Sequence, residues 1–341
     1  MKKYKIFLLL IILTLTNGCY SYFNVSTSLF PISMGIDFQD GIFSIIYFID
    51  DDLNENKNNI IKGSGTSLAE AESNLNASIT KNINTSFLKS IILSKSLTDN
   101  TDFVGLLLYY LSDPKFVKST YLYLSDENII DLFKNGKNFY DISIYPSITT
   151  KEGTSIKTII KPLTLINIAS HYLDNLQRIY LPSLTLDDID NYIYLDGTCF
   201  TSYTQEFALQ CLSNQDNKGL RWMDQISGMI ITPQGYETTL KGIVSDNIVT
   251  LNYKNNNLSI NLNTSISLVT VYDDINPVEI KTKFEEIIKE EITITYKKAL
   301  TLQVDIYNLK AFIKKEYSKD YDLPNELNVS VNVTINTKSH Y

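Results

Sequence analysis

Apolar and polar residues recur along this chain with periods typical of both strands and helices. Residues 41–49 are mostly apolar, which is typical of a largely buried strand, whereas residues 329–335 alternate and predict a half-buried one. Residues 68–79 carry apolar side chains at helical spacing. The same reasoning predicts strands over 60–63, 88–93 and 118–124, helices over 103–112, 163–173 and 307–317, an extended segment from Pro182, and a strand-rich stretch over 228–271.

Two of the predicted helices begin with capping signals. Ser67 and Glu70 form a capping box, and Asn276 followed by Pro277 suits the cap and first position of a long helix. On that long helix the spacing predicts a buried stripe of Ile280, Phe284, Ile287 and Ile288, with Lys281, Glu285, Glu286 and Lys289 elsewhere. We expect the stripe to bury against a sheet that carries Val329, Val331 and Val333.

The order of these elements predicts an α+β (mixed α/β) class. A chain of 341 residues rarely forms one core, so several domains are expected. We predict a signal peptide over 1–18, an N-terminal α/β domain over 19–190, a small middle domain with a β-hairpin over 191–227, and a C-terminal α/β domain over 228–341.

The N-terminus has the pattern of an export signal. Lysines at positions 2, 3 and 5 precede an apolar run over 6–13, which is too short to span a membrane. The run ends at Gly18-Cys19, which resembles a bacterial lipobox, although Thr16 stands where Leu is usual. The resemblance implies that Cys19 is lipidated and becomes the new N-terminus. An ordinary signal peptide with an incidental Cys is the alternative.

Composition argues against several classes of function. The net charge is −8 without a basic cluster, which disfavours nucleic-acid binding. The chain has only two histidines, His171 and His340. This small number disfavours both catalysis by a histidine base and a histidine-rich metal site. No later segment is apolar enough to span a membrane, since the best candidate, 103–111, ends at Ser112-Asp113-Pro114.

Each remaining candidate site has a simpler structural explanation. Residues 50–56 have part of the spacing of a calcium loop but lack its Gly and its final Glu, so a solvated loop is favoured. Gly63-Ser64-Gly65 precedes a helix without the rest of a phosphate-binding motif. The pair Asp187-Asp188 is too common a pattern to indicate a glycosidase. We therefore expect no catalytic, cofactor-binding or metal-binding residues, and Trp222 is expected to be a packing residue or an interface anchor.

Cys199 and Cys211 raise the question of a disulfide. A hairpin turn near 203–204 would place Cys199 opposite about Ala208 and Cys211 on the other face of the sheet. This register predicts that the two cysteines do not pair.

Several segments resemble the Ger(x)C-type spore germination lipoproteins. The similar segments are, in order, 34–37 (Met-Gly-Ile-Asp), the helix over 65–82, the turn at 111–114, the block 195–200 (Leu-Asp-Gly-Thr-Cys-Phe) with 212–213 and 218–222 (Lys-Gly-Leu-Arg-Trp), the helix from Pro277, 304–309 and Tyr317. Tyr20-Ser21-Tyr22 departs from the residues that usually follow the lipidated Cys.

The resemblance implies a three-domain lipoprotein, anchored by an acyl chain such as palmitate to the outer face of the spore inner membrane. It also implies that the protein acts together with the integral-membrane A and B subunits of a germinant receptor. The resemblance carries over no catalytic residues. The alternatives are a lipid-anchored extracytoplasmic solute-binding protein, which would close two lobes on a cleft, and an enzyme such as a wall hydrolase.

Overall fold

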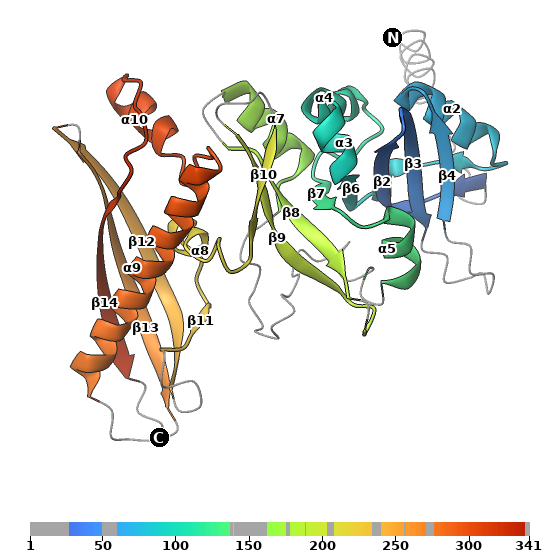
Figure 1. The fold of residues 1–341 in the computed structure, drawn as a ribbon. Coiled ribbons are helices and arrows are strands. Elements are labelled where there is room, and N and C mark those ends of the chain that lie inside the picture. Colours follow the sequence, from blue (N-terminus) through green and yellow to red (C-terminus); the bar gives the residue numbers. More distant parts are fainter. Residues whose placement is uncertain are drawn as a thin grey trace, which may run out of the picture.

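The computed structural model describes residues 27–49, 60–136, 139, 162–174, 178–187, 189–202, 208–233, 240–255, 257–270 and 276–337. Two sheets dominate it, an eight-stranded sheet in the first two thirds of the chain and a four-stranded sheet in the last third (Figure 1). The predicted multi-domain α+β class is confirmed.

The eight-stranded sheet has a parallel centre and antiparallel ends. Its spatial order is β10-β9-β8-β7-β6-β2-β3-β4, and β2, β6, β7 and β8 run parallel. The strands are β2 (Pro31–Gln39), β3 (Ile42–Ile49), β4 (Ile60–Gly65), β6 (Ser90–Ser94), β7 (Tyr121–Ser125), β8 (Tyr180–Leu186), β9 (Ile193–Thr201) and β10 (Leu209–Ser213). The hairpin of β9 and β10 thus continues the N-terminal sheet, and the division into three domains stays a prediction.

Helices cover both faces of this sheet, which explains why its central strands are buried throughout. On β6, Ile91 and Leu93 pack on one face with the helices α2, α3, α4 and α7, whereas Ile92 packs on the other face with α5. The helices are α2 (Leu68–Ala77), α3 (Lys95–Asn100), α4 (Phe103–Ser112), α5 (Ile129–Asn135) and α7 (Leu165–Asp174). A short parallel pair, β1 (Ser28–Leu29) with β5 (Asn82–Ile83), and a 3-10 turn over Thr85–Phe87 complete this part.

The C-terminal part is a four-stranded sheet with one long helix across a single face. Its order is β11-β12-β13-β14, with β13 and β14 parallel and the other pairs antiparallel. The bounds are α8 (Leu220–Met223), β11 (Ile230–Ile231), β12 (Leu240–Lys254), β13 (Asn257–Thr270), α9 (Pro277–Thr301), α10 (Leu309–Tyr317) and β14 (Asn328–Thr337). Asn255 turns the hairpin of β12 and β13 with a φ of 53°, a conformation that Asn tolerates.

The predicted stripe of α9 faces the sheet as expected. Ile280, Phe284 and Ile288 are fully buried, and Ile287 is partly buried against the same core. The facing strand contributes Val329 and Val333. Asn276 caps the helix by accepting the Val278 N–H at 3.0 Å. Glu285, expected away from the core, accepts the Val333 N–H at 3.0 Å and so covers part of the β14 edge.

We predict that Phe284→Ala in the ectodomain beginning at residue 20 lowers the free energy of unfolding by about 3–5 kcal/mol, because it empties a fully buried site. Glu286 is exposed on the same helix, so Glu286→Ala is the matched control and should change stability by less than about 0.5 kcal/mol. Urea denaturation measures both. Equal effects of the two substitutions would mean that the stripe does not form the core.

Candidate functional site

The histidine and acidic residues singled out in the sequence do not assemble into a reactive site in the described part of the chain. His171 binds the Arg178 carbonyl through Nδ1 at 2.8 Å, and Asp187 accepts the Ile189 N–H at 2.8 Å, so both stabilise local structure. Residues 50–56, Asp188, His340 and Cys19 lie outside the described residues. Within the described ranges no three His, Cys, Asp or Glu side chains gather where they could hold a metal ion.

The Gly63-Ser64-Gly65 segment belongs to β4 and packs against α2. A Cβ on Gly63 would lie 2.3 Å from the Ala71 carbonyl oxygen, so glycine is needed for the close approach of helix and strand. At the helix start, Ser67 accepts the Glu70 N–H at 3.2 Å, and Glu70 accepts the N–H of Thr66 at 2.7 Å. The predicted capping box is therefore present, although Glu70 accepts the N–H of Thr66 instead of the N–H of Ser67. It uses two of the N–H groups at this end of the helix.

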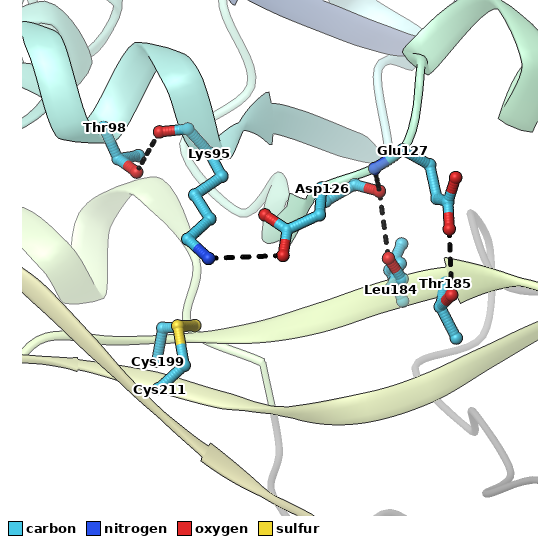
Figure 2. A network of polar contacts seen from close by, with 9 residues as sticks. Lys95, Thr98, Asp126, Glu127, Leu184, Thr185, Cys199 and Cys211 are labelled. Carbon is cyan, nitrogen blue, oxygen red and sulfur yellow. Dashed lines mark hydrogen bonds and ion pairs between the residues drawn. A yellow bond between two sulfur atoms is a disulfide. The ribbon is translucent and has the colours of Figure 1, made fainter.

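Open α/β sheets usually place ligands at the carboxyl ends of their parallel strands. In this sheet the polar side chains at that edge bind one another (Figure 2). Lys95 Nζ lies 3.3 Å from Asp126 Oδ2, and the Thr185 hydroxyl donates to Glu127 at 3.1 Å. The Ser125 hydroxyl accepts the Glu127 N–H at 3.1 Å. The Lys95–Asp126 pair is largely exposed and contributes little stability, so these contacts mainly align neighbouring elements.

Cys199 and Cys211 form a disulfide, so the expectation that they do not pair is wrong (Figure 2). The register explains the error, because Cys199 lies opposite Cys211 rather than opposite Ala208. The hairpin loop is thus longer than the sequence suggested, and both side chains fall on the same face. Cys199 is fully buried while Cys211 is exposed. A stable disulfide fits an exported protein.

A largely buried ion pair joins α8 to α9. Arg221 is 6% exposed and its Nη2 lies 2.5 Å from Oε1 and 2.7 Å from Oε2 of Glu291. The indole N–H of Trp222 donates to the same carboxylate at 2.6 Å. Asn247 on β12 donates to the Trp222 carbonyl at 2.9 Å. One glutamate therefore fixes two neighbouring side chains of α8, and Trp222 is a buried packing residue.

Arg178 connects this C-terminal assembly to the eight-stranded sheet. Its guanidinium donates to Asp224, at the end of α8, at 2.7 Å, and lies 5.5 Å from the centre of the Tyr180 ring. Its backbone N–H donates to Asn308 Oδ1 at 3.1 Å. Phe200 of the eight-stranded sheet is buried in the same core as α9. The end of the eight-stranded sheet is thus buried in the apolar core of the C-terminal part, and this region with its charged contacts is called the junction below.

The Asn308 side chain is available for this contact because another residue caps α10. Asp305 accepts the N–H groups of Leu309 at 2.9 Å and Lys310 at 2.8 Å. Burial raises the pKa of the Asp305 carboxyl, while these two hydrogen bonds and Arg178 oppose the rise. Asn308 itself has a φ of 53°, a left-handed conformation that turns its amide toward Arg178.

Comparisons with known proteins place the chain in a family. The model described as "Spore germination protein N-terminal domain" matches residues 24–186, and the one described as "Spore germination B3/ GerAC like, C-terminal" matches residues 209–340. The chain belongs to this family of spore germination proteins. A solved structure titled "Crystal Structure of the GerBC protein" has the same fold, with a TM-score of 0.58 over 89% of this chain and 96% of that chain at 15% identity. No curated protein matches the chain.

In this spore germination protein, segments that carry the family resemblance form much of the junction. Arg221 and Trp222 come from the Lys-Gly-Leu-Arg-Trp segment, and a Cβ on its Gly219 would lie 2.5 Å from the Glu291 carbonyl oxygen. Asp305 and Asn308 come from the 304–309 segment. Sequence reasoning did not find their role. The available signal was an Arg beside the only Trp, because an Arg that is buried with a large apolar side chain needs an acidic partner.

We predict that an ectodomain beginning at residue 20 has no free thiol before reduction and two after it, because only Cys199 and Cys211 remain of the three cysteines. Reduction should lower the free energy of unfolding by about 2–4 kcal/mol, since the disulfide closes a loop in the unfolded chain. Thiol titration in denaturant and urea curves with and without reductant measure these effects. Two reactive thiols in unreduced protein would contradict the pairing.

We predict that Glu291→Ala destabilises the ectodomain by about 3–5 kcal/mol, because it leaves the Arg221 guanidinium buried without its carboxylate and frees the Trp222 N–H. The neighbouring Glu290 is exposed, so Glu290→Ala should stay within about 0.5 kcal/mol. Urea denaturation of both variants tests the role of Glu291. A Glu291 variant as stable as the Glu290 variant would show that the junction tolerates loss of this contact.

Proposed function

We propose that this spore germination protein is a non-enzymatic, lipid-anchored subunit of a germinant receptor. In this role it sits on the outer face of the spore inner membrane and acts with integral-membrane A and B subunits in nutrient-triggered germination. The observation that carries the proposal is the match of the two family models, in order, to residues 24–186 and 209–340. The fold shared with the GerBC protein over 89% of the chain supports it.

The proposed anchor is a lipid on Cys19, at the end of the signal-like segment. Among the helices that the structure describes, none is both long and apolar enough to cross a bilayer. The net charge of −8, without a basic cluster, gives no electrostatic attraction to an anionic lipid surface. A lipid would hold the chain beside its membrane partners and raise its effective concentration for them.

The proposed mechanism is structural. The elements from β2 to β10 and those from α8 to β14 follow one another along the long direction of the molecule (Figure 1). The junction joins them through a shared core and the Arg178 contacts. A contact made with a membrane subunit at one end can therefore alter contacts at the other end, provided that the junction stays closed.

The alternative of a solute-binding protein receives limited support from the structure. A pocket with a volume of about 920 Å³ lies in the first part of the chain, among residues between Tyr47 and Phe116. It is formed within one part of the eight-stranded sheet and its helices, not between two lobes that could close on a ligand.

We predict that Cys19→Ala abolishes incorporation of a fatty-acid analogue and leaves an uncleaved precursor. It should also lower the amount of chain that co-purifies with the integral-membrane subunits from detergent-solubilised spore membranes. Cys211→Ser is the matched control, because it removes a cysteine of the ectodomain and should keep the label. Equal labelling of the Cys19 variant and the unaltered protein would contradict the anchor. The receptor role would be contradicted if the unaltered protein is labelled normally but no membrane subunit co-purifies with it.

A further inference from the structure

The pocket beside α2 brings together charged and phenolic groups that the proposed function does not use. Tyr47 from β3 and Glu72 from α2 line it, and Asp113 from the loop after α4 lies in its wall. Leu75, Ile79, Ile83 and Phe116 form its apolar surface, and Lys81 and Lys115 lie in the same lining. Its volume of about 920 Å³ is within the range of small-molecule sites.

One tyrosine hydroxyl in the wall of this pocket has no hydrogen-bond partner among the described residues. Tyr47 is 4% exposed and lines the pocket, and within the described part of the chain its hydroxyl is influenced by burial and by the charges of Glu72 and Asp113 but by no hydrogen bond. Tyr110 is fully buried outside the pocket lining, and its hydroxyl interacts with the Glu72 carboxylate. Buried polar groups are normally paired, so the unpaired Tyr47 hydroxyl in the pocket wall is suited to bind a polar ligand.

The electrostatics of the pocket favour a cation near Glu72. Burial raises the pKa of the Glu72 carboxyl, and the nearby Asp113 charge adds to the rise, while Tyr110 and Lys115 oppose it. Burial also raises the pKa of the Tyr47 phenol, with further contributions from Glu72 and Asp113. The two carboxylates therefore repel each other in the free protein, and a bound positive charge would relieve that repulsion.

The wall that carries Asp113 is held in place by local bonds. Asp113 Oδ1 accepts the Lys115 N–H at 2.9 Å, and the Thr85 hydroxyl donates to the Lys115 carbonyl at 2.9 Å. Lys118 Nζ donates to the Asp113 carbonyl at 2.6 Å. The loop after α4 is thus tied to the segment after β5, and both form the pocket together with α2.

We propose that this pocket binds a small zwitterion with a primary ammonium group, held by Glu72, Asp113 and the Tyr47 hydroxyl, and with its anionic group near Lys81 and Lys115. A primary ammonium has three donors, which matches these three acceptors. The apolar wall accommodates the carbon chain between the two charged groups. A quaternary ammonium lacks N–H donors and would leave the acceptors unpaired.

Two sources supply this chemistry, a free solute such as an amino acid or the ethanolamine headgroup of a membrane lipid. The pocket lies close to the proposed tether, because β5 pairs with β1 and Asn82 and Ile83 of β5 line the pocket. The nine residue-to-residue steps from Cys19 to Ser28 span at most about 30 Å. The lipid source rests on the proposed anchor at Cys19, whereas binding of a free zwitterion does not.

The test is calorimetric titration of the purified ectodomain with glycine, phosphoethanolamine and phosphocholine, combined with flotation on phosphatidylethanolamine and phosphatidylcholine vesicles. The proposal predicts binding of at least one primary-ammonium probe, free or in vesicles, and no comparable binding of its choline counterpart. Binding of a free probe identifies a solute site, and flotation with phosphatidylethanolamine alone identifies a headgroup site. No binding of any primary-ammonium probe, or equal binding of the choline probes, would overturn the proposal.

Two substitutions in the pocket should weaken binding by about tenfold or more, because each removes a bond to a charged group. They are Glu72→Gln, which removes the carboxylate charge, and Tyr47→Phe, which removes only the hydroxyl. Tyr123→Phe is the matched control, since that buried hydroxyl is also unpartnered but belongs to the core on the other face of the sheet.

Glu316→Gln on the exposed end of α10 controls for loss of charge. Far-UV circular dichroism checks that each variant is folded. If Glu72→Gln does not fold, the affinity of Tyr47→Phe and the comparison of the ligands test the proposed site. Unchanged affinity in the folded pocket variants would contradict the assignment. None of the free-probe results depends on the receptor role. A pocket that binds no probe therefore leaves the proposed receptor function standing, and a failure of the receptor proposal leaves the pocket proposal standing.

Discussion

The carboxylate of Glu291 is the constraint on which the arrangement of the two sheets depends. It receives the guanidinium of Arg221 and the indole N–H of Trp222, both in a largely buried setting. A charge buried in this way requires its partner in one geometry, because loss of either member leaves an uncompensated ion. The pair therefore fixes α8 against α9, and Asp224 at the end of α8 is then placed to receive Arg178 from the other sheet.

The apolar core supplies most of the stability around these contacts, and the polar groups determine orientation. Phe200 and Leu212 of the eight-stranded sheet are buried with Ile288 and Ile292 of α9, and apolar contacts alone tolerate small shifts between packed elements. Hydrogen bonds from Arg178 to Asp224 and Asn308 restrict such shifts because they are directional. In the proposed role, this restriction is what would let contact at one end of the ectodomain influence the other.

Sequence reasoning located the elements whose signals are local. The helix expected over 103–112 has those bounds, because an apolar run lies between the cap Asp102 and Pro114. The α9 stripe was also found, since its spacing shows which face is buried. Contacts between distant segments were not predictable in this way. Glu291 lies in a polar run that looks solvated, and its burial depends on α8, about seventy positions earlier.

The disulfide and the pocket were missed for the same reason. A hairpin register depends on the loop length, and an error of three positions reversed the conclusion about Cys211. Glu72 looks like an exposed residue of an amphipathic helix, and only the approach of Tyr47 and the loop at Asp113 encloses it. Family resemblance supplied the fold and the class, but not the physical role of the residues that carry it.

We expect the two sheets to unfold as one unit, because the end of the eight-stranded sheet is buried in the core of the C-terminal part. Trp222 is the only tryptophan and lies within the junction, so its fluorescence reports on that region, whereas far-UV circular dichroism reports on both sheets. The direct measurement is a urea titration of the ectodomain followed by both signals. If the junction holds the two sheets together, both signals change in coincident transitions with one midpoint. A tryptophan transition at clearly lower urea than the main loss of secondary structure would show that the junction opens separately and does not hold the two sheets together.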